Sequence, residues 1–380
     1  MHLTAKVKLL PTAEQAEALK RTLEAANAAC NYISERAWRE STFRQFSLHK
    51  LVYYDVRGRF GLSSQMAVRC ISKVADAYKL DRRTRRSFRR VGAIAYDNRI
   101  LSWKRGEQAV SIWTMDGRQT IPFACGERQR ELLQGQKGES DLALIDGEFY
   151  LLATCEVDTP EPAEFEGALG VDLGIVNIAT DGDGQVYSGA RVNNLRRRHA
   201  RLRSRLQQKG TKSAKRLLKK RRRREHRFAQ DVNHVISKRI VEKAKGTGRA
   251  IGLEDLTGIR DRTTVGRRQR RRHHSWAFHD LRRKIEYKAA LAGVPVILVD
   301  PRNTSRSCPV CGCVDRRNRT TQSKFSCIRC GFSGHADTIA AVNIGRRAVV
   351  NQPNVSTEAP KGNIVVNCGA ARGQGQALDF

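Results

Sequence analysis

The sequence contains no hydrophobic run long enough to cross a membrane. Its longest apolar stretch, VPVILV at residues 294–299, is far shorter than the roughly 20 residues that a spanning helix needs. The first ten residues, MHLTAKVKLL, alternate polar and apolar side chains and lack the continuous apolar core of a secretory signal. We therefore expect a soluble, intracellular and cytoplasmic protein with no membrane partner.

Acidic residues are scarce. The chain has 38 Asp and Glu against 71 Lys and Arg, which gives a net charge of +33 over 380 residues. A compact chain with this excess repels itself unless polyanions or salt offset the charge. An apolar content of 40% is too high for a disordered basic tail. The composition therefore predicts a folded, multidomain protein that binds nucleic acid.

Cysteine is not spread along the chain as in a disulfide framework, because five of ten cysteines lie between Cys308 and Cys330. This crowding favours a metal site in a reducing compartment. The motifs CPVCG and CIRCG supply two cysteine pairs, Cys308 with Cys311 and Cys327 with Cys330, with fifteen residues between Cys311 and Cys327. That spacing is typical of a zinc ribbon, in which four thiolates leave no open position. The alternative is four free thiols that share this spacing by chance.

The amino-terminal third predicts helices inserted into a β unit. Residues 2–10 predict a strand, and Thr12 with Gln15 predicts a capping box that starts a helix. Apolar residues then recur at helical spacing up to Ala37, and again from Met66 to Tyr78. Both stripes include a cysteine, which we interpret as core residues, Cys30 and Cys70. The segments AVSIWT, QTIPFA, DLALI and FYLLATC alternate and predict a small barrel or sandwich.

Residues 191–227 hold eighteen Arg or Lys and one acidic residue, Glu225. A charge run of this kind is either a solvated face or a surface for phosphates, and the lack of acidic partners favours a phosphate-facing helical hairpin over 191–245, broken near Gly210. A basic loop follows at 260–274. The residues expected to contact nucleic acid are Arg196, Arg197, Arg198, Arg201, Lys219, Lys220, Arg221, Arg222, Arg223, Arg224, Arg267 and Arg268.

Two aspartates in the sequence DGDG, Asp181 and Asp183, resemble the start of a calcium loop. No further ligands follow at the spacing that such a loop requires. We therefore interpret DGDG as the turn of a hairpin.

Three carboxylates lie on apolar elements, where an unpaired charge is costly. Asp172 lies in LGVDLG, Glu254 ends AIGLE, and Asp337 begins the helical pattern ADTIAAVNI. Each has an ordinary alternative: a turn residue, a strand-end partner for Arg, and a helix N-cap. If one sheet gathers them, they are suited to bind two magnesium ions for phosphodiester hydrolysis.

The order LGVDLG, GLEDL, NTSRSCPVCG…CIRCG and HADTIAAVNI resembles the TnpB family, the RNA-guided nucleases of small bacterial insertion sequences, whose relatives are the miniature type V CRISPR nucleases. The segments KVKLLPTAEQ, LSSQMAVRCISKVADAYK, AYDNRI and IEYKAALAGVPVILVDPRNTSRSC are also similar. The resemblance covers about residues 1–348.

The resemblance implies a multidomain α/β and all-β protein with an RNase H-like (RuvC) nuclease domain. The implied domains are a β-barrel (wedge) at 1–12 and 91–158, a helical recognition insertion at 13–90, an acidic linker at 159–167, the nuclease domain at 168–303 and 332–348, an inserted zinc ribbon at 304–331, and a disordered tail at 349–380.

The resemblance also implies the chemistry and the partners. Asp172, Glu254 and Asp337 become the Mg²⁺-binding catalytic triad of an endonuclease that leaves 5′-phosphates, and the four cysteines hold structural Zn²⁺. The implied partners are a guide RNA from the end of the element and double-stranded DNA beside a short adjacent motif. The alternatives are a miniature CRISPR nuclease with the same chemistry and a guided repressor that does not cleave. The chain departs from the family at Ile339, where Asn is usual, and retains Asn343.

Overall fold

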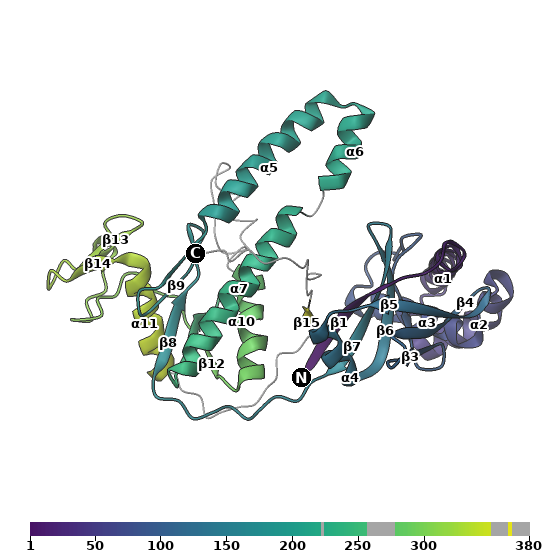
Figure 1. Ribbon diagram of the computed structural model, residues 1–380, viewed down its shortest axis with the longest axis horizontal. Helices are drawn as coiled ribbons and strands as arrows, with labels where there is room; N and C mark the ends of the chain where they lie inside the picture. Colours follow the sequence, from purple (N-terminus) through teal and green to yellow (C-terminus); the bar gives the residue numbers. More distant parts are fainter. Residues whose placement is uncertain (222–223, 257–277, 351–363, 367–380) are drawn as a thin grey trace. The chain divides into compact units, whose positions relative to one another are not determined.

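The computed structural model describes residues 1–221, 224–256, 278–350 and 364–366, which form two compact units (Figure 1). The first unit holds residues 1–157 and 361–380, and the second holds 158–360. The predicted basic loop at 260–274 lies outside the described residues, as do most of the predicted tail and the predicted contacts Arg222, Arg223, Arg267 and Arg268. None of the helices in the described ranges is long and apolar enough to span a membrane.

The first unit is built on an antiparallel sheet with the strand order β2-β6-β7-β1-β5-β4-β3. The four alternating segments of the sequence form β4 to β7, as predicted. Within the described residues the edge strands β2 and β3 do not pair, so the sheet is barrel-like without being fully closed. The strands are β1 (His2–Leu9), β2 (Ile94–Tyr96), β3 (Leu101–Lys104), β4 (Ala109–Thr114), β5 (Gly117–Ala124), β6 (Gln136–Ile145) and β7 (Glu148–Glu156).

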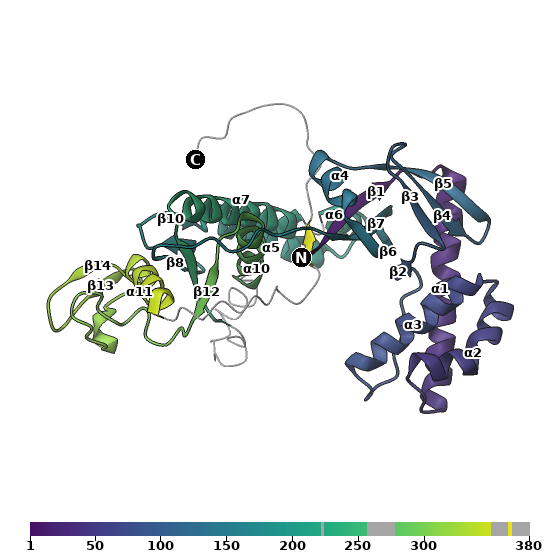
Figure 2. The same cartoon turned by 90° about the horizontal axis from the view of Figure 1, so that it is seen from below.

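Three helices follow β1 and pack as a group beside this sheet (Figure 2). The capping box at Thr12 and Gln15 is confirmed, and both Cys30 and Cys70 are fully buried core residues. One helix, α2, was not predicted, because only three of its side chains are buried and exposed apolar residues such as Phe46 and Tyr54 obscure their spacing in the sequence. The helices are α1 (Ala13–Arg39), α2 (Gln45–Phe60) and α3 (Ser64–Leu80), with a short α4 (Glu127–Gln134) before β6.

The second unit is built on a five-stranded mixed sheet with the order β10-β9-β8-β11-β12. Strands β8, β11 and β12 are parallel, whereas β9 is antiparallel to both of its neighbours. The strands are β8 (Ala168–Asp172), β9 (Asn177–Asp181), β10 (Val186–Ser188), β11 (Ala250–Glu254) and β12 (Val296–Val299).

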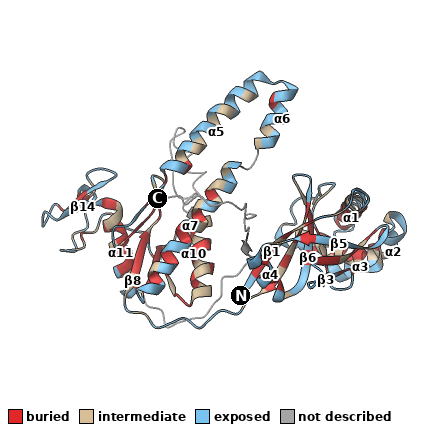
Figure 3. Cartoon of the chain, in the orientation of Figure 1, coloured by how far each residue is buried: buried red, intermediate tan, exposed pale blue. Residues whose placement is uncertain are grey.

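Helices cover both faces of this sheet, and their buried sides face the strands (Figure 3). Helices α7 (Arg224–Gly246) and α10 (Phe278–Ala292) pack on one face through an apolar core that includes Leu169 and Leu253. Helix α11 (Ala336–Val350) packs on the other face through Ile344 and Ala348. The sheet is therefore a buried central layer, as its apolar strands predict.

The basic hairpin forms as predicted. Helix α5 (Ala190–Lys209) ends at Gly210, whose φ of 63° is the left-handed conformation that glycine accommodates at a helix end. Helices α6 (Lys212–Arg221) and α7 form the returning arm. Glu225, the acidic residue of this segment, lies 3.6 Å from Arg196 and 3.7 Å from Arg203 and so joins the two arms.

The predicted linker and tail each differ from expectation in part. The linker lacks regular structure, but its backbone amides donate to the second unit, Ala163 to Gly293 and Glu166 to Gly248. In the predicted tail, Val349 and Val350 end α11, and β15 (Ile364–Val366) pairs in parallel with β1. The prediction of disorder is therefore wrong for these residues. Strand β1 pairs with β5 only at Lys8 and Leu9, so its earlier residues offer a pairing site on that side to a short apolar segment.

Candidate active site

Two neighbouring strands end in the same pattern, a glycine, an apolar residue and a carboxylate. On β8 this is Gly170-Val171-Asp172, and on β11 it is Gly252-Leu253-Glu254. The register pairs Gly170 with Gly252 and Val171 with Leu253. Because side chains alternate between faces, the two carboxylates lie side by side on the α11 face at the carboxyl ends of both strands.

The glycines allow α11 to lie very close to these strands. A Cβ atom added to Gly170 would lie 2.0 Å from the carbonyl oxygen of Ala341, and one added to Gly252 would lie 3.0 Å from the Cβ of Ala348. Asp337 is the second residue of α11, so this close approach brings it to the face that carries Asp172 and Glu254. The structure therefore gathers the three predicted carboxylates on one side of the sheet.

The electrostatic environment of Asp172 and Glu254 is unfavourable for negative charge. Burial raises the pKa of Asp172 to about 7, with further contributions from the charges of Glu254 and Asp337 and partial compensation by Arg319. Burial also raises the pKa of Glu254. Half-buried carboxylates that repel one another are a donor set that suits divalent cations. Within the described residues, the oxygens of the three do not all lie within 4.8 Å of one another.

Three residues that the sequence analysis did not assign hold these carboxylates. The hydroxyl of Thr304 donates to Oε1 of Glu254 at 2.5 Å. The side-chain amide of Asn177 donates to Oδ2 of Asp337 at 3.0 Å, and the guanidinium of Arg319 lies 3.4 Å from Oδ1. They are distant from the carboxylates along the chain, so no local pattern indicates these contacts.

The four predicted zinc ligands form one cluster. Their sulfur atoms all lie within 4.8 Å of one another, with 3.6 Å between Cys308 and Cys330 and 3.5 Å between Cys311 and Cys327. The fifth cysteine of this region, Cys313, is not part of the cluster. Four thiolates in this arrangement fit a structural zinc ion. The ribbon also contains η1 (Arg316–Asn318) and β13 (Lys324–Ser326). Strand β13 pairs with β14 (Ser333–His335), which lies just past the predicted end of the ribbon at residue 331.

Ile339, the departure from the family pattern, has a packing role in the structure. It is buried in a small apolar cluster with Phe325 and Ala336 and with two of the cysteines, Cys308 and Cys327. Ile339 therefore packs the ribbon against the start of α11, away from any polar contact. Asn343, one turn further, donates from its amide nitrogen to two backbone carbonyls.

The predicted nucleic-acid contacts differ in their exposure. Six of the described candidates are exposed on the hairpin: Arg197, Arg198, Arg201, Lys219, Lys220 and Arg224. Arg196 and Arg221 are half-buried. Arg196 pairs with Glu225, and burial lowers its pKa. It is therefore placed to stabilise the hairpin more than to reach a phosphate.

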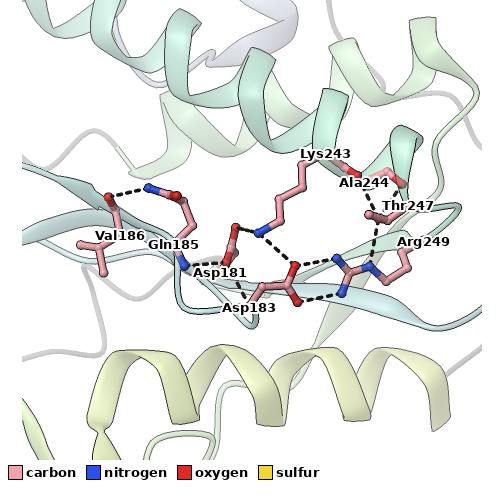
Figure 4. Close-up of polar contacts among 8 residues, drawn as sticks. All are labelled: Asp181, Asp183, Gln185, Val186, Lys243, Ala244, Thr247 and Arg249. Atoms are coloured by element: carbon pink, nitrogen blue, oxygen red, sulfur yellow. Dashed lines mark hydrogen bonds and ion pairs between the residues drawn. The ribbon is translucent and has the colours of Figure 1, made fainter. Parts of the chain in front are cut away.

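The DGDG sequence forms the β9–β10 turn, as predicted, and its aspartates bind side-chain cations (Figure 4). Lys243 lies 2.7 Å from fully buried Asp181 and 2.9 Å from Asp183. Arg249 donates two hydrogen bonds to Asp183, at 2.9 and 2.6 Å. These cations hold the pKa of Asp183 well below its usual range, so this cluster is structural.

Two family models match the chain, almost entirely within the second unit. One, described as "Probable transposase", matches residues 153–257, and the other, described as "Cas12f1-like, TNB domain", matches residues 278–344. The first contains Asp172 and Glu254, and the second contains the four clustered cysteines and Asp337.

The chain is also similar to whole proteins. It is 41% identical over 136 residues to the CRISPR-associated endodeoxyribonuclease Cas12f1 of Sulfoacidibacillus thermotolerans, covering 35% of this chain and only 30% of that protein. Its fold is similar to Cas12f1 in a cryo-EM structure with sgRNA and target DNA, with a TM-score of 0.57, 14% identity, and coverage of 88% of this chain and 83% of the other.

A third protein aligns with this chain over most of its length. This is a TnpB-like protein of Methanocaldococcus jannaschii, which is 31% identical over 200 residues, or 49% of this chain and 71% of that protein. Because this relative is more than 30% identical and is matched over 71% of its length, the chain belongs to the TnpB-like family.

Proposed function

We propose that this protein is an RNA-guided DNA endonuclease encoded by an insertion sequence, which cleaves DNA beside a short adjacent motif by metal-dependent hydrolysis. The observation that carries the proposal is the gathering of Asp172, Glu254 and Asp337 on one face of the β8–β11 pair. Carboxylates with raised pKa values, such as Asp172 and Glu254, cluster at functional sites. Membership of the TnpB-like family and the mixed sheet of the second unit support a RuvC-like nuclease domain.

We assign different roles to the three carboxylates. Asp172 and Asp337 would flank the cations, and Glu254 would hold the second cation or orient the attacking water. Two Mg²⁺ ions bound there would activate water and stabilise the leaving oxygen of the phosphodiester, which leaves a 5′-phosphate. Asn177 and Arg319 fix the two oxygens of Asp337, so the carboxylate is oriented before any ion binds.

The basic hairpin of the second unit supports the proposed nucleic-acid partners. Its exposed Arg and Lys side chains include Arg197, Arg201 and Lys219. Such a surface gains affinity by releasing counterions from phosphates, whatever the base sequence. Such sequence-independent binding is sufficient in a guided nuclease, because base pairing with the guide RNA reads the target while the protein holds the nucleic-acid backbone. The zinc ribbon, which is itself basic, would contribute to target binding.

A miniature CRISPR nuclease with the same chemistry is the second candidate. The similarity to Cas12f1 over the ribbon and nuclease residues favours it. The two candidates differ in the source of the guide, because a repeat array supplies one and the end of the element supplies the other.

The test is RNA co-purification from cells that express the protein with its native flanking DNA, followed by sequencing. We expect one structured RNA that ends in a variable segment matching adjacent DNA. An RNA with array repeats would favour the CRISPR candidate. Heterogeneous cellular RNA that moderate salt removes would contradict a guided function.

A further inference from the structure

A single buried threonine connects Glu254 to the ribbon. Thr304 lies between β12 and the first zinc-ligand pair, and its side chain is 3% exposed. Its hydroxyl has two acceptors within reach, Oε1 of Glu254 at 2.5 Å and the carbonyl of Pro301 at 3.1 Å. A hydroxyl proton favours the charged and closer acceptor, so Thr304 fixes one oxygen of Glu254.

The backbone of this threonine is held in turn by α11. Nδ2 of Asn343 donates to the carbonyl oxygen of Thr304 and to that of Ser307, each at 2.8 Å. Both acceptors are carbonyls, so the orientation of the amide is fixed by its two hydrogens. Ser307 directly precedes the zinc ligand Cys308.

One side chain of α11 therefore contacts the segment that orients Glu254 and the segment that leads into the cysteine cluster. Asn343 is only 6% exposed, and a buried amide that loses its partners is costly. The same helix carries Asp337 at its first turn. The position of Glu254 relative to Asp337 consequently depends on Thr304 and Asn343.

We propose that Thr304 and Asn343 are positioning residues that orient Glu254 for metal binding and couple the carboxylate site to the zinc ribbon. This inference rests on the proposed function, since it treats Glu254 as a metal ligand. Contacts of this kind behind metal ligands typically change metal affinity by about 10- to 100-fold when they are removed. Coupling between two sites is reciprocal. We therefore expect a change at Asn343, which contacts the segments leading to both sites, to affect the carboxylate site and the zinc ribbon.

The test is Mn²⁺ binding to the full-length, zinc-loaded protein without nucleic acid, measured by the loss of the electron paramagnetic resonance signal of free Mn²⁺. Thr304→Val keeps the shape and removes the hydroxyl, whereas Thr304→Ser keeps the hydroxyl. We expect Thr304→Val to weaken Mn²⁺ binding about tenfold and Thr304→Ser to bind like the wild type. The matched control is Thr247→Val, which removes a hydroxyl that donates to the carbonyls of Lys243 and Ala244 and accepts from Arg249, and that contacts none of the three carboxylates.

Wild-type affinity in Thr304→Val would overturn the inference and leave the proposed function intact. A wild-type protein that binds no Mn²⁺ would instead overturn the proposed metal site itself. Circular dichroism and zinc content, measured on each variant, separate loss of orientation from loss of folding.

Asn343→Leu tests the coupling, because leucine has nearly the same shape and no donor. We expect this variant to bind Mn²⁺ about tenfold more weakly and to release zinc to a colorimetric chelator faster than the wild type. Faster zinc release with unchanged Mn²⁺ affinity would show that Asn343 serves the ribbon alone and would overturn the proposed coupling.

Discussion

Two acidic clusters lie on neighbouring strands of the second unit and differ in how their charge is balanced. Asp181 pairs across the ladder with Val171, the residue before Asp172. The Asp181–Asp183 cluster has its own cations, Lys243 and Arg249, and the pKa of Asp183 is lowered. At the other cluster the pKa of Asp172 is raised to about 7, by burial and then by the neighbouring carboxylates.

The difference separates a structural cluster from a functional one. Carboxylates that stabilise a fold are paired with Lys or Arg side chains. Carboxylates that bind an exchangeable metal ion keep part of their negative charge unpaired, and their pKa values are perturbed as a result. Arg319 lies near Asp337 and lowers the pKa of Asp172, but it does not reverse the effect of burial. The following predictions test this contrast, beginning with the largest expected change in free energy.

Removing the charge of Asp181 should cost the most stability. Asp181→Asn leaves the Lys243 ammonium with Asp183 alone, and breaking a buried pair on one side costs roughly 3 kcal/mol at the lower end of the usual range. Asp183→Asn should cost less than about 1 kcal/mol, because Asp183 is 40% exposed and exposed pairs contribute little. Urea denaturation measures the loss of stability in each variant. Equal losses would contradict the greater cost expected for the buried charge of Asp181.

Mn²⁺ should stabilise the protein only where the carboxylate cluster is complete. A ligand at 100 times its dissociation constant adds about 2.7 kcal/mol to the stability of the folded state. We expect the melting temperature of the wild type and of Asp183→Asn to rise with Mn²⁺, and that of Asp337→Asn to change little. The measurement is differential scanning fluorimetry with and without Mn²⁺. An undiminished rise in Asp337→Asn would place the ion elsewhere.

The raised pKa of Asp172 predicts that Asp172→Asn makes the metal-free protein more stable, by an amount that depends on pH. The unfolded chain ionises this carboxyl near pH 3.9 and the folded protein only near pH 7. Ionisation therefore favours the unfolded state progressively between these values, and stability falls as pH rises. The full shift corresponds to about 4 kcal/mol. Because Asp172 is only partly buried, we expect about half of this difference, so above pH 7 Asp172→Asn, which cannot ionise, should be more stable than the wild type by about 2 kcal/mol.

Denaturant unfolding in a chelating buffer from pH 4 to pH 8 checks this prediction. The advantage of Asp172→Asn should grow with pH and level off above pH 7. An advantage that is constant across the whole range would show that the charge of Asp172 carries no penalty.

The smallest effect is expected at the hairpin. Glu225→Gln removes the pairings with Arg196 and Arg203, which we expect to lower stability by about 0.5 kcal/mol. Thermal unfolding in low salt measures this loss, and the difference from the wild type should shrink in high salt. A loss that salt does not change would mean that Glu225 acts through packing.

The sequence predicted those parts of the site that local chemistry specifies. Apolar neighbours on both strands mark Asp172 and Glu254, because an unpaired carboxylate is costly in such a position. The zinc ligands follow from spacing alone. Thr304, Asn177 and Arg319 were missed because their partners are distant in the chain and only the folded sheet brings them together.

The elements of the fold that local patterns specify were also predicted, and those that depend on distant contacts were missed. Alternation and capping predicted β4 to β7 and α1, since these signals are local. Helix α2 was missed because it buries only three residues, Leu48, Val52 and Val56. The short strand β15 depends on pairing with β1 more than 350 positions away, which no local pattern indicates. Ile339 was noted as a departure, but its packing against Phe325 required the ribbon to be in place.

The most direct test of the proposed site is Mg²⁺-dependent cleavage of DNA matched to the co-purified RNA, with the wild type beside Asp172→Asn and Asp183→Asn. Losing several kcal/mol of transition-state stabilisation corresponds to about a thousand-fold lower rate. We predict that loss for Asp172→Asn and near wild-type cleavage for Asp183→Asn. Cleavage by Asp172→Asn at the wild-type rate would contradict the assignment of the nuclease centre to Asp172, Glu254 and Asp337.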